Sequence, residues 1–189
     1  MTILKIISKM YQKYRVFYYY RLSENKTGIN IQIFKQPVLI EGKGVVSIHK
    51  SSRIGVDYSP GFMESYGYIE ARNSISQIII GENVQINNNI AIISEGEGIE
   101  IGDYTLIGHN VEIIDSDFHN LETGKRLTGK PKTGKVKIGK NVFIGNNVKI
   151  TKGVINGDNS IIGIGSVVTS SFPGNCIIGG NPARLIRSL

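Results

Sequence analysis

A six-residue rhythm in the second half of the chain constrains its fold more than any other feature. From Ile80 onward an aliphatic residue recurs at every sixth position, in units such as IGENVQ, IGHNVE and IGKNVF. Eleven of twelve such positions between 80 and 168 are Ile or Val, with breaks at 94–98 and 115–135. The period is neither 2 nor 3.6, which excludes both a long strand and a helix. It is typical of short strands and tight turns that repeat around a triangular prism.

Three such units close one coil, and stacked coils bury a continuous column of Ile and Val. Residues 38–79 carry a weaker version of the pattern, in which Ile48 and Ile54 are six apart. We interpret this stretch as irregular first coils. Asn156 occupies an aliphatic position of the repeat, and a buried amide there requires hydrogen-bond partners. The sequence therefore predicts one all-β domain over 38–187, a parallel β-helix.

Five motifs within this region occur together and in a fixed order: INNNIAIIS, DSDFH, NVFIGNNV, GDNSIIGIGSVVT and GGNPARLIR. On these motifs the chain resembles the hexapeptide-repeat acyltransferases over roughly residues 40–187. It is most similar to sugar O-acetyltransferases of surface-polysaccharide pathways and to maltose and galactoside acetyltransferases. The resemblance implies a left-handed β-helix, acetyl-CoA as co-substrate, a saccharide acceptor, and homotrimers with active sites between subunits.

Residues 1–22 form a separate unit, predicted to be an amphipathic helix. Apolar residues follow a 4-3-4-3 spacing, which places them on one helical face: Ile3, Ile7, Met10, Tyr14 and Phe17. One interpretation is a helix that packs on the prism or on a neighbouring subunit. The alternative is a basic, Tyr-rich helix that rests on the anionic inner face of a membrane as a peripheral contact.

Composition and charge limit the other classes of function. The net charge of +7 suggests anionic partners, but no nucleic-acid-binding motif accompanies it, so nucleic acid is not an expected partner. Cys176 is the only cysteine, which excludes an intramolecular disulfide and a cysteine cluster for zinc. The histidines lack the paired H-x4-H spacing of a three-histidine zinc site, so no metal is expected. No uncharged apolar run approaches ~18 residues, and we expect a cytoplasmic location.

The break at 115–135 opens with DSDFH, two aspartates and a histidine in a loop that interrupts the scaffold. By the resemblance, the general base is a loop histidine at this point, which is His119. Histidine suits the role because its unperturbed pKa is near neutral. Asp115 or Asp117 would hold its other ring nitrogen. His109 and His49 are interpreted as structural and surface residues.

The resemblance also assigns binding residues. Asn87 matches an asparagine that contacts the acceptor or the acetyl oxygen, with Asn89 as the second choice. The expected coenzyme A contacts are Asn146, Ile164 and Thr169, together with two C-terminal arginines for its phosphates, Arg184 and Arg187. Ser170 stands where relatives often have Lys, which removes one phosphate contact.

We therefore expect an acetyl-CoA-dependent O-acetyltransferase that acts on a saccharide hydroxyl in surface-polysaccharide biosynthesis. An N-acetyltransferase of a nucleotide-linked amino sugar is the first alternative. Residues 1–60 contain no G-x-G-x-x-G loop, which favours the hydroxyl. The other alternative is a non-enzymatic hexapeptide-repeat scaffold, in which the loop histidine and the terminal arginines are incidental.

Overall fold

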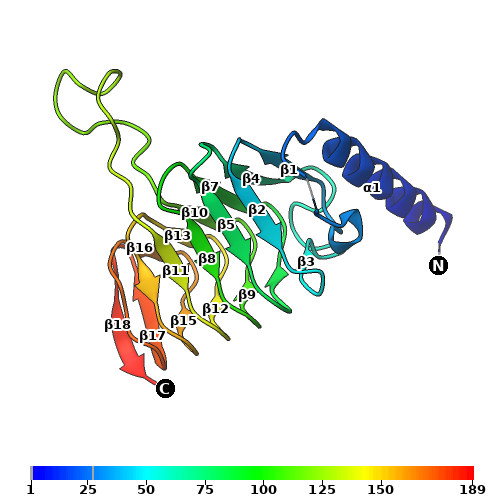
Figure 1. The fold of residues 1–189 in the computed structure, drawn as a ribbon. Coiled ribbons are helices and arrows are strands. Elements are labelled where there is room, and N and C mark those ends of the chain that lie inside the picture. The colour runs from blue at the N-terminus through cyan, green and yellow to red at the C-terminus, as the bar shows by residue number, and fades with distance from the viewer. Residues whose placement is uncertain (1, 27) are drawn as a thin grey trace.

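The computed structural model describes residues 2–26 and 28–189, in which short strands wind into a parallel β-helix (Figure 1). A helix, α1 (Ile3–Leu22), and a 3-10 turn, η1 (Ile31–Ile33), precede the strands. The first sheet contains β1 (Val38–Glu41), β4 (Gly67–Ala71), β7 (Ala91–Ser94), β10 (Glu112–Ile114), β13 (Lys149–Ile150) and β16 (Val167–Val168). The second contains β2 (Val45–Ile48), β5 (Gln77–Ile80), β8 (Ile99–Ile101), β11 (Val136–Ile138) and β14 (Ile155–Asn156).

The third sheet contains β3 (Arg53–Ile54), β6 (Gln85–Ile86), β9 (Leu106–Ile107), β12 (Phe143–Ile144), β15 (Ile161–Ile162), β17 (Cys176–Gly180) and β18 (Ala183–Ser188). In each coil the chain passes from the first sheet to the second and then to the third. All pairings between these strands are parallel except the final one, in which β18 folds back antiparallel on β17. The parallel β-helix predicted from the six-residue period is therefore confirmed.

The repeat positions form the core of the prism. All twelve first positions of the hexads are buried, and they stack in register across the sheets, as Ile86, Ile107 and Ile144 do in the third. Asn156 joins this column at 1% exposure. Among the described residues neither Oδ1 nor Nδ2 of Asn156 has a hydrogen-bond partner. The hydrogen-bond partners that a buried amide requires at this position are therefore missing from the described residues.

Two corners of the prism carry distinct sets of side chains and loops. The "asparagine corner" joins the third sheet to the first sheet of the next coil. Along it Asn89, Asn110 and Asn147 adopt positive φ of 61°, 56° and 59°, which asparagine tolerates better than most residues. Their side chains form a ladder, with Nδ2 to Oδ1 distances of 2.9 and 2.8 Å. The "loop corner" joins the first sheet to the second and carries residues 95–98 and 115–135.

Helix α1 extends from the N-terminal end of the prism (Figure 1). Three residues of the helix are buried against the rest of the protein. Two of them are polar, Gln12 and Arg15, and the third is Val16. The Arg15 guanidinium donates to the carbonyl oxygens of Met63 at 2.5 Å and Ser65 at 2.7 Å. These contacts anchor the helix to the segment between β3 and β4.

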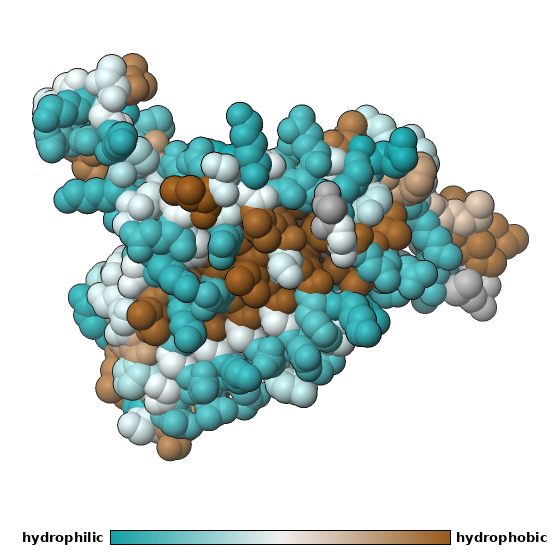
Figure 2. Space-filling model, viewed as in Figure 1, coloured by the Kyte–Doolittle hydropathy of each residue, from teal (hydrophilic) through white to brown (hydrophobic). Residues whose placement is uncertain are grey.

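The predicted apolar face of α1 points away from the prism. All five stripe residues are exposed: Ile3, Ile7, Met10, Tyr14 and Phe17. The prediction that this face packs on the prism of the same chain is therefore wrong. The hydrogen bonds of Gln12 and Arg15 hold the opposite face of the helix against the prism. Figure 2 shows apolar atoms at the free end of the helix. No helix among residues 2–26 and 28–189 is long and apolar enough to cross a membrane.

Candidate active site

The loop at 115–135 leaves the prism through a short antiparallel neck. Ser116 pairs with Thr133, and the Gly134 N–H donates to the Asp115 carbonyl oxygen at 2.9 Å. Beyond this neck the segment projects far from the coils (Figure 1), and its surface is mostly polar (Figure 2). The interruption of the repeat therefore builds a projecting arm at the loop corner.

The Asp115 carboxylate anchors this arm to the preceding coil. It is fully buried and accepts hydrogen bonds from the Ser94 hydroxyl at 2.7 Å and the Glu95 N–H at 2.7 Å. The N–H groups of Gly96 and Gly98 add contacts at 3.2 and 2.8 Å. Four donors thus surround one carboxylate, and none of them belongs to His119.

Asp117 is held in a different way. Its Oδ1 pairs with the Lys152 ammonium at 2.7 Å, which ties the arm to the following coil. Its Oδ2 is buried and has no partner among the described residues. The prediction that Asp115 or Asp117 orients the His119 ring is therefore corrected, since both carboxylates hold the neck of the arm.

A backbone carbonyl orients His119 instead. The Nδ1 atom lies 3.2 Å from the carbonyl oxygen of Arg126, within the same arm. A carbonyl oxygen can only accept, so Nδ1 carries the proton of the neutral ring and Nε2 keeps its lone pair. The side chain is exposed, and the preceding Phe118 has a φ of 58°, which is uncommon for a bulky residue. The ring is thus exposed to solvent, and the lone pair of its Nε2 has no hydrogen-bond partner among the described residues.

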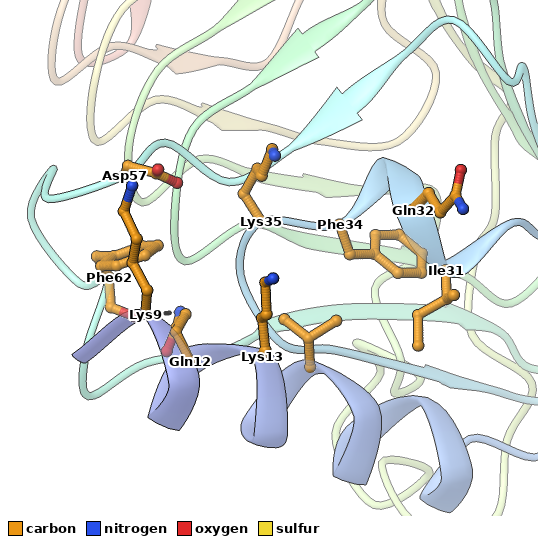
Figure 3. Close-up of a pocket in the computed structure, with 10 residues that line it drawn as sticks. Lys9, Gln12, Lys13, Ile31, Gln32, Phe34, Lys35, Asp57 and Phe62 are labelled. Atoms are coloured by element: carbon orange, nitrogen blue, oxygen red, sulfur yellow. Dashed lines mark hydrogen bonds between the residues drawn. The ribbon is translucent and has the colours of Figure 1, made fainter. Parts of the chain in front are cut away.

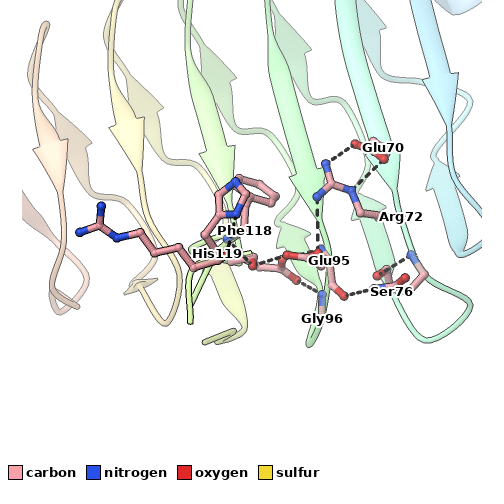
Figure 4. Close-up of polar contacts among 11 residues, drawn as sticks. Glu70, Arg72, Ser76, Glu95, Gly96, Phe118 and His119 are labelled. Carbon is pink, nitrogen blue, oxygen red and sulfur yellow. Dashed lines mark hydrogen bonds and ion pairs between the residues drawn. The ribbon is translucent and has the colours of Figure 1, made fainter. Parts of the chain in front are cut away.

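A polar network from two other coils supports the base of the arm (Figure 4). The Arg72 guanidinium makes two 3.0 Å contacts with the Glu70 carboxylate and one of 3.5 Å with Glu95. The Ser116 hydroxyl donates to Glu95 at 2.5 Å, and the Arg72 guanidinium lies 4.8 Å from the Phe118 ring centre. Hydrogen bonding to Glu70 raises the pKa of Arg72, which stays charged. The network links the first sheet to the residue that precedes His119.

Asn87 lies at the asparagine corner, between β6 and β7. Its Oδ1 accepts from the Asn88 N–H at 2.7 Å, while its Nδ2 makes no hydrogen bond within the described part of the chain. Asn87 lines a depression of about 230 Å³ together with Asn146, Leu106 and Phe143. The amide of Asn89 is committed to the asparagine ladder. Of the two predicted acceptor residues, only Asn87 has an Nδ2 that makes no hydrogen bond within the described part of the chain.

Within one chain His119 and Asn87 do not meet. Asn87 precedes the first-sheet strand β7, whereas His119 follows the first-sheet strand β10 of the next coil. Four residues of strand separate the two corners, which is ~13 Å at about 3.3 Å per residue. The two residues therefore lie on opposite edges of the first sheet.

The predicted coenzyme contacts are also distributed over the prism. Asn146 and Ile164 lie at the asparagine corner, whereas Thr169 follows β16 at the loop corner. Asn146 Oδ1 accepts from the His109 N–H at 2.8 Å. Arg184 and Arg187 lie exposed on β18, where each guanidinium contacts only a local backbone carbonyl. None of these positions is tested by the structure, and their roles stay predictions.

Sequence reasoning missed the residues that hold the site in place. Asn88, in the middle of INNN, is fully buried, and its amide binds the segment 56–60 through backbone atoms. Arg72 and Glu95 belong to different coils, so their contact becomes apparent only once the coils are stacked. The only sequence signal for the Arg72–Glu95 contact is that each residue directly follows a first-sheet strand.

Comparison with known proteins gives relatives of one kind, although no family model matches the chain. The galactoside O-acetyltransferase of Escherichia coli (strain K12) is 40% identical over 114 residues, covering 60% of this chain and 55% of that protein. The chain thus spans about half the length of this relative. The solved structure of the polySia-specific acetyltransferase NeuO superposes with a TM-score of 0.66 at 29% identity, covering 82% of this chain and 66% of the other.

A galactoside acetyltransferase solved in complex with coenzyme A superposes with a TM-score of 0.58 at 25% identity. That match covers 100% of this chain and 84% of the other. Homologues and structural neighbours of the chain are therefore hexapeptide-repeat O-acetyltransferases, and their shared fold is the left-handed β-helix. The family resemblance and the fold class expected from the sequence are both confirmed.

Proposed function

We propose that the protein is an acetyl-CoA-dependent O-acetyltransferase that modifies a saccharide hydroxyl in surface-polysaccharide biosynthesis, with His119 as general base. The observation that carries the proposal is the contact between His119 Nδ1 and the Arg126 carbonyl oxygen. It leaves Nε2 unprotonated on a projecting arm. An alcohol is a weak nucleophile, so acetyl transfer requires a positioned side chain that removes the hydroxyl proton during attack.

In the proposed reaction, His119 Nε2 takes the hydroxyl proton as the oxygen attacks the thioester carbonyl. The carbon–sulfur bond then breaks, and the imidazolium returns its proton to the departing thiolate. No covalent enzyme intermediate is needed when both substrates occupy one cleft. Cys176 is buried, which argues against a cysteine nucleophile.

Acetyl-CoA supplies the acetyl thioester, and this chain has features that fit its two ends. The depression lined by Asn87 and Asn146 has apolar walls at Leu106 and Phe143, which suit the uncharged arm of the coenzyme. Arg184 and Arg187 form no ion pair among residues 2–26 and 28–189, so both are free to bind phosphate. The coenzyme A in the galactoside acetyltransferase structure supports this assignment by analogy.

We further propose a homotrimer with active sites between subunits. His119 and Asn87 are on opposite edges of one prism, so a shared site requires the arm of one subunit and the asparagine corner of another. Leu121 and Leu127 are 66% and 91% exposed on the arm, as expected for side chains that a neighbour covers. Subunit mixing tests the arrangement: the His119→Ala and Asn87→Ala proteins, each inactive alone, should regain activity when refolded together. Failure of the mixture would argue for a site within one chain.

A saccharide hydroxyl is the acceptor that the relatives support, since their names specify galactosides and polySia. Release of free thiol from acetyl-CoA, measured across a panel of sugars and amino sugars, tests the reaction directly. We expect release with hydroxyl acceptors and loss of release in the His119→Ala protein. Release only with amino sugars would favour the N-acetyltransferase alternative, and no release with any acceptor would favour a scaffold.

We also propose that α1 rests on an anionic membrane surface. Residues 3–22 contain no acidic residue, and the stripe turned away from the prism is apolar and aromatic. Arg15 is buried against the prism, whereas the other basic residues of the helix are exposed: Lys5, Lys9, Lys13 and Arg21. That combination is typical of interfacial helices. Replacing Met10 and Phe17 with Ser should reduce sedimentation with vesicles containing phosphatidylglycerol. Replacing the exposed Leu106 and Ile155 of the prism is the matched control and should leave sedimentation unchanged.

A further inference from the structure

A cleft of about 600 Å³ lies between α1 and the N-terminal coils. Figure 3 shows its walls, with Lys9 and Lys13 on the helix and Lys35 and Asp57 opposite. No predicted catalytic or cofactor residue lines it. It is larger than the depression of about 230 Å³ that contains Asn87, and the expected chemistry gives it no role.

The cleft carries unbalanced positive charge. It has three lysines, Lys9, Lys13 and Lys35, and one acid, Asp57, which leaves 3 − 1 = +2. Some lysines elsewhere in the described residues have an acidic partner, as Lys140 has Asp103 at 2.7 Å and Lys152 has Asp117 at 2.7 Å. The three cleft lysines form no such pair. Like charges that share one cavity repel each other, and a bound anion removes that repulsion.

The floor of the cleft is apolar. Val16, Phe34 and Phe62 line it and are buried, at 8%, 6% and 4% exposure. The three lysines are themselves exposed, so their ammonium groups can contact an anion while an apolar group packs on the floor. The cavity therefore suits a multiply charged anion that carries an apolar or flat group beside it.

The two walls are held rigidly with respect to each other. Gln12 Nε2 donates to the Phe62 carbonyl oxygen at 2.6 Å, and Arg15 binds the carbonyls of the same segment. Neither Gln12 nor Arg15 is free to serve a ligand, and both fix α1 against residues 59–66. A cleft built this way is preorganised, so binding does not require ordering of its walls.

The cleft adjoins the proposed acceptor position. Val56 lines the depression that contains Asn87, and the next residue, Asp57, lines the α1 cleft. The Asn88 side chain fixes this junction by binding both the N–H and the carbonyl oxygen of Val56, each at 3.0 Å. The linings of the cleft and of the depression that contains Asn87 are thus joined by consecutive residues of one chain segment.

From this arrangement we propose that the α1 cleft binds the diphosphate group of the acetyl acceptor, a saccharide joined through diphosphate to a second group on the apolar floor. A diphosphate diester carries two negative charges, which match the net +2, and lysines bind phosphate as point charges. The inference rests on the proposed acetyltransferase function only in naming the ligand as the acetyl acceptor. Diphosphate binding is measurable without any acetyl transfer.

The test is calorimetric titration of the full chain with inorganic pyrophosphate in the presence of saturating coenzyme A, which fills the proposed cofactor site. Exchanging Lys13 and Lys35 for Gln should weaken binding by ~10-fold or more, since each replacement removes a charged contact. Lys5→Gln with Lys50→Gln removes the same net charge outside the cleft and should change binding less than about twofold. Circular dichroism confirms that each protein is folded.

Equal binding by the wild-type and Lys13/Lys35 proteins would overturn the proposal, as would an equal loss in the Lys5/Lys50 control. Two further probes distinguish the source of the diphosphate. Tighter binding of farnesyl diphosphate than of uridine diphosphate assigns the apolar floor to a lipid-linked saccharide, and the reverse order assigns it to a nucleotide-linked one. If the titrations show diphosphate binding that depends on Lys13 and Lys35 while no sugar supports thiol release, the proposed binding site is supported and the proposed acetyl-transfer reaction is contradicted.

Discussion

The guanidinium carbon of Arg72 lies 4.8 Å from the ring centre of Phe118, the residue that precedes His119. Arg72 reaches this position because Glu70 and Glu95 hold its guanidinium from two sides, at 3.0 and 3.5 Å. The contact joins the rigid first sheet to the base of a projecting arm. Through Phe118, the sheet therefore limits the positions that the His119 ring can take.

Arg72→Met should lower kcat by ~10-fold while leaving the KM for acetyl-CoA nearly unchanged, because misplacement of a base weakens the transition state more than substrate binding. The ring contact itself contributes only ~0.5–1 kcal/mol at this partly exposed site. Steady-state kinetics measure both constants. Arg53→Met, a change of the same type on the outer face of the third sheet, is the control and should leave kcat intact. A rise in KM alone would argue against a positioning role.

Asp115→Asn should destabilise the protein more than it affects the chemistry. The replacement puts an NH2 group among four donors that now point at a carboxylate, and hydrogen bonds to charged groups are worth ~1.5–3 kcal/mol each. We expect a fall of ~2–4 kcal/mol in the free energy of unfolding, measured by urea denaturation. Asp117→Asn, which removes one part-exposed ion pair, is the comparison and should lower it by less. Equal losses would mean that the neck does not depend on Asp115.

The repeat made the scaffold predictable. A residue such as Ile86 or Ile144 is buried because six-residue spacing returns the chain to the same face of a prism, and that spacing is visible in one dimension. The projecting arm was equally visible as a break in the spacing. Contacts between coils were not, because Arg72 and Glu95 are 23 residues apart and meet only through the register of stacked strands.

The outward face of α1 shows a second limit of sequence reasoning. Its apolar stripe is real, but the stripe alone does not say which partner covers it. The side that binds the prism is decided by polar contacts of Gln12 and Arg15 with backbone carbonyls. Every residue has a backbone carbonyl, so the sequence does not indicate which ones these side chains contact. The orientation of His119 by the Arg126 carbonyl oxygen was unpredictable for the same reason.

Stability at alkaline pH should report on Tyr68, on the outer face of β4. Burial, together with the Glu70 carboxylate, raises the pKa of Tyr68 from 10.0 to about 12. Below pH 10 the ring is neutral in both states. Between pH 10 and 12 the unfolded chain ionises first, so the free energy of unfolding falls as pH rises. Tyr68→Phe should remove part of this fall, by less than about 1.4 kcal/mol per pH unit because the ring is only partly buried. Denaturation curves at pH 9, 10 and 11 would measure it, and parallel losses in both proteins would contradict the assignment.

Replacing both Arg184 and Arg187 with Ala should raise the KM for acetyl-CoA and affect kcat less. Both guanidinium groups lie exposed on β18 with only local carbonyl contacts, so their loss leaves the fold intact. Charge-assisted contacts with phosphate contribute ~1.5–3 kcal/mol each when formed. Dephospho-coenzyme A competition in the wild-type protein identifies any contact with the 3′-phosphate. An unchanged KM would mean that the two arginines do not contact the coenzyme.

His119→Ala should lower kcat by ~10²–10⁴, because general-base catalysis contributes about that factor. His109→Ala is the matched control, since the contribution of His109 to the asparagine corner is its backbone N–H, which the substitution retains. Acetyl-CoA binding and assembly should be nearly unchanged in both proteins, as measured by calorimetry and analytical ultracentrifugation. Added imidazole should restore part of the turnover of His119→Ala, because a free base can enter the space that the exposed ring leaves. If His119→Ala keeps near wild-type turnover while His109→Ala loses it, the general base lies at the asparagine corner instead of on the arm.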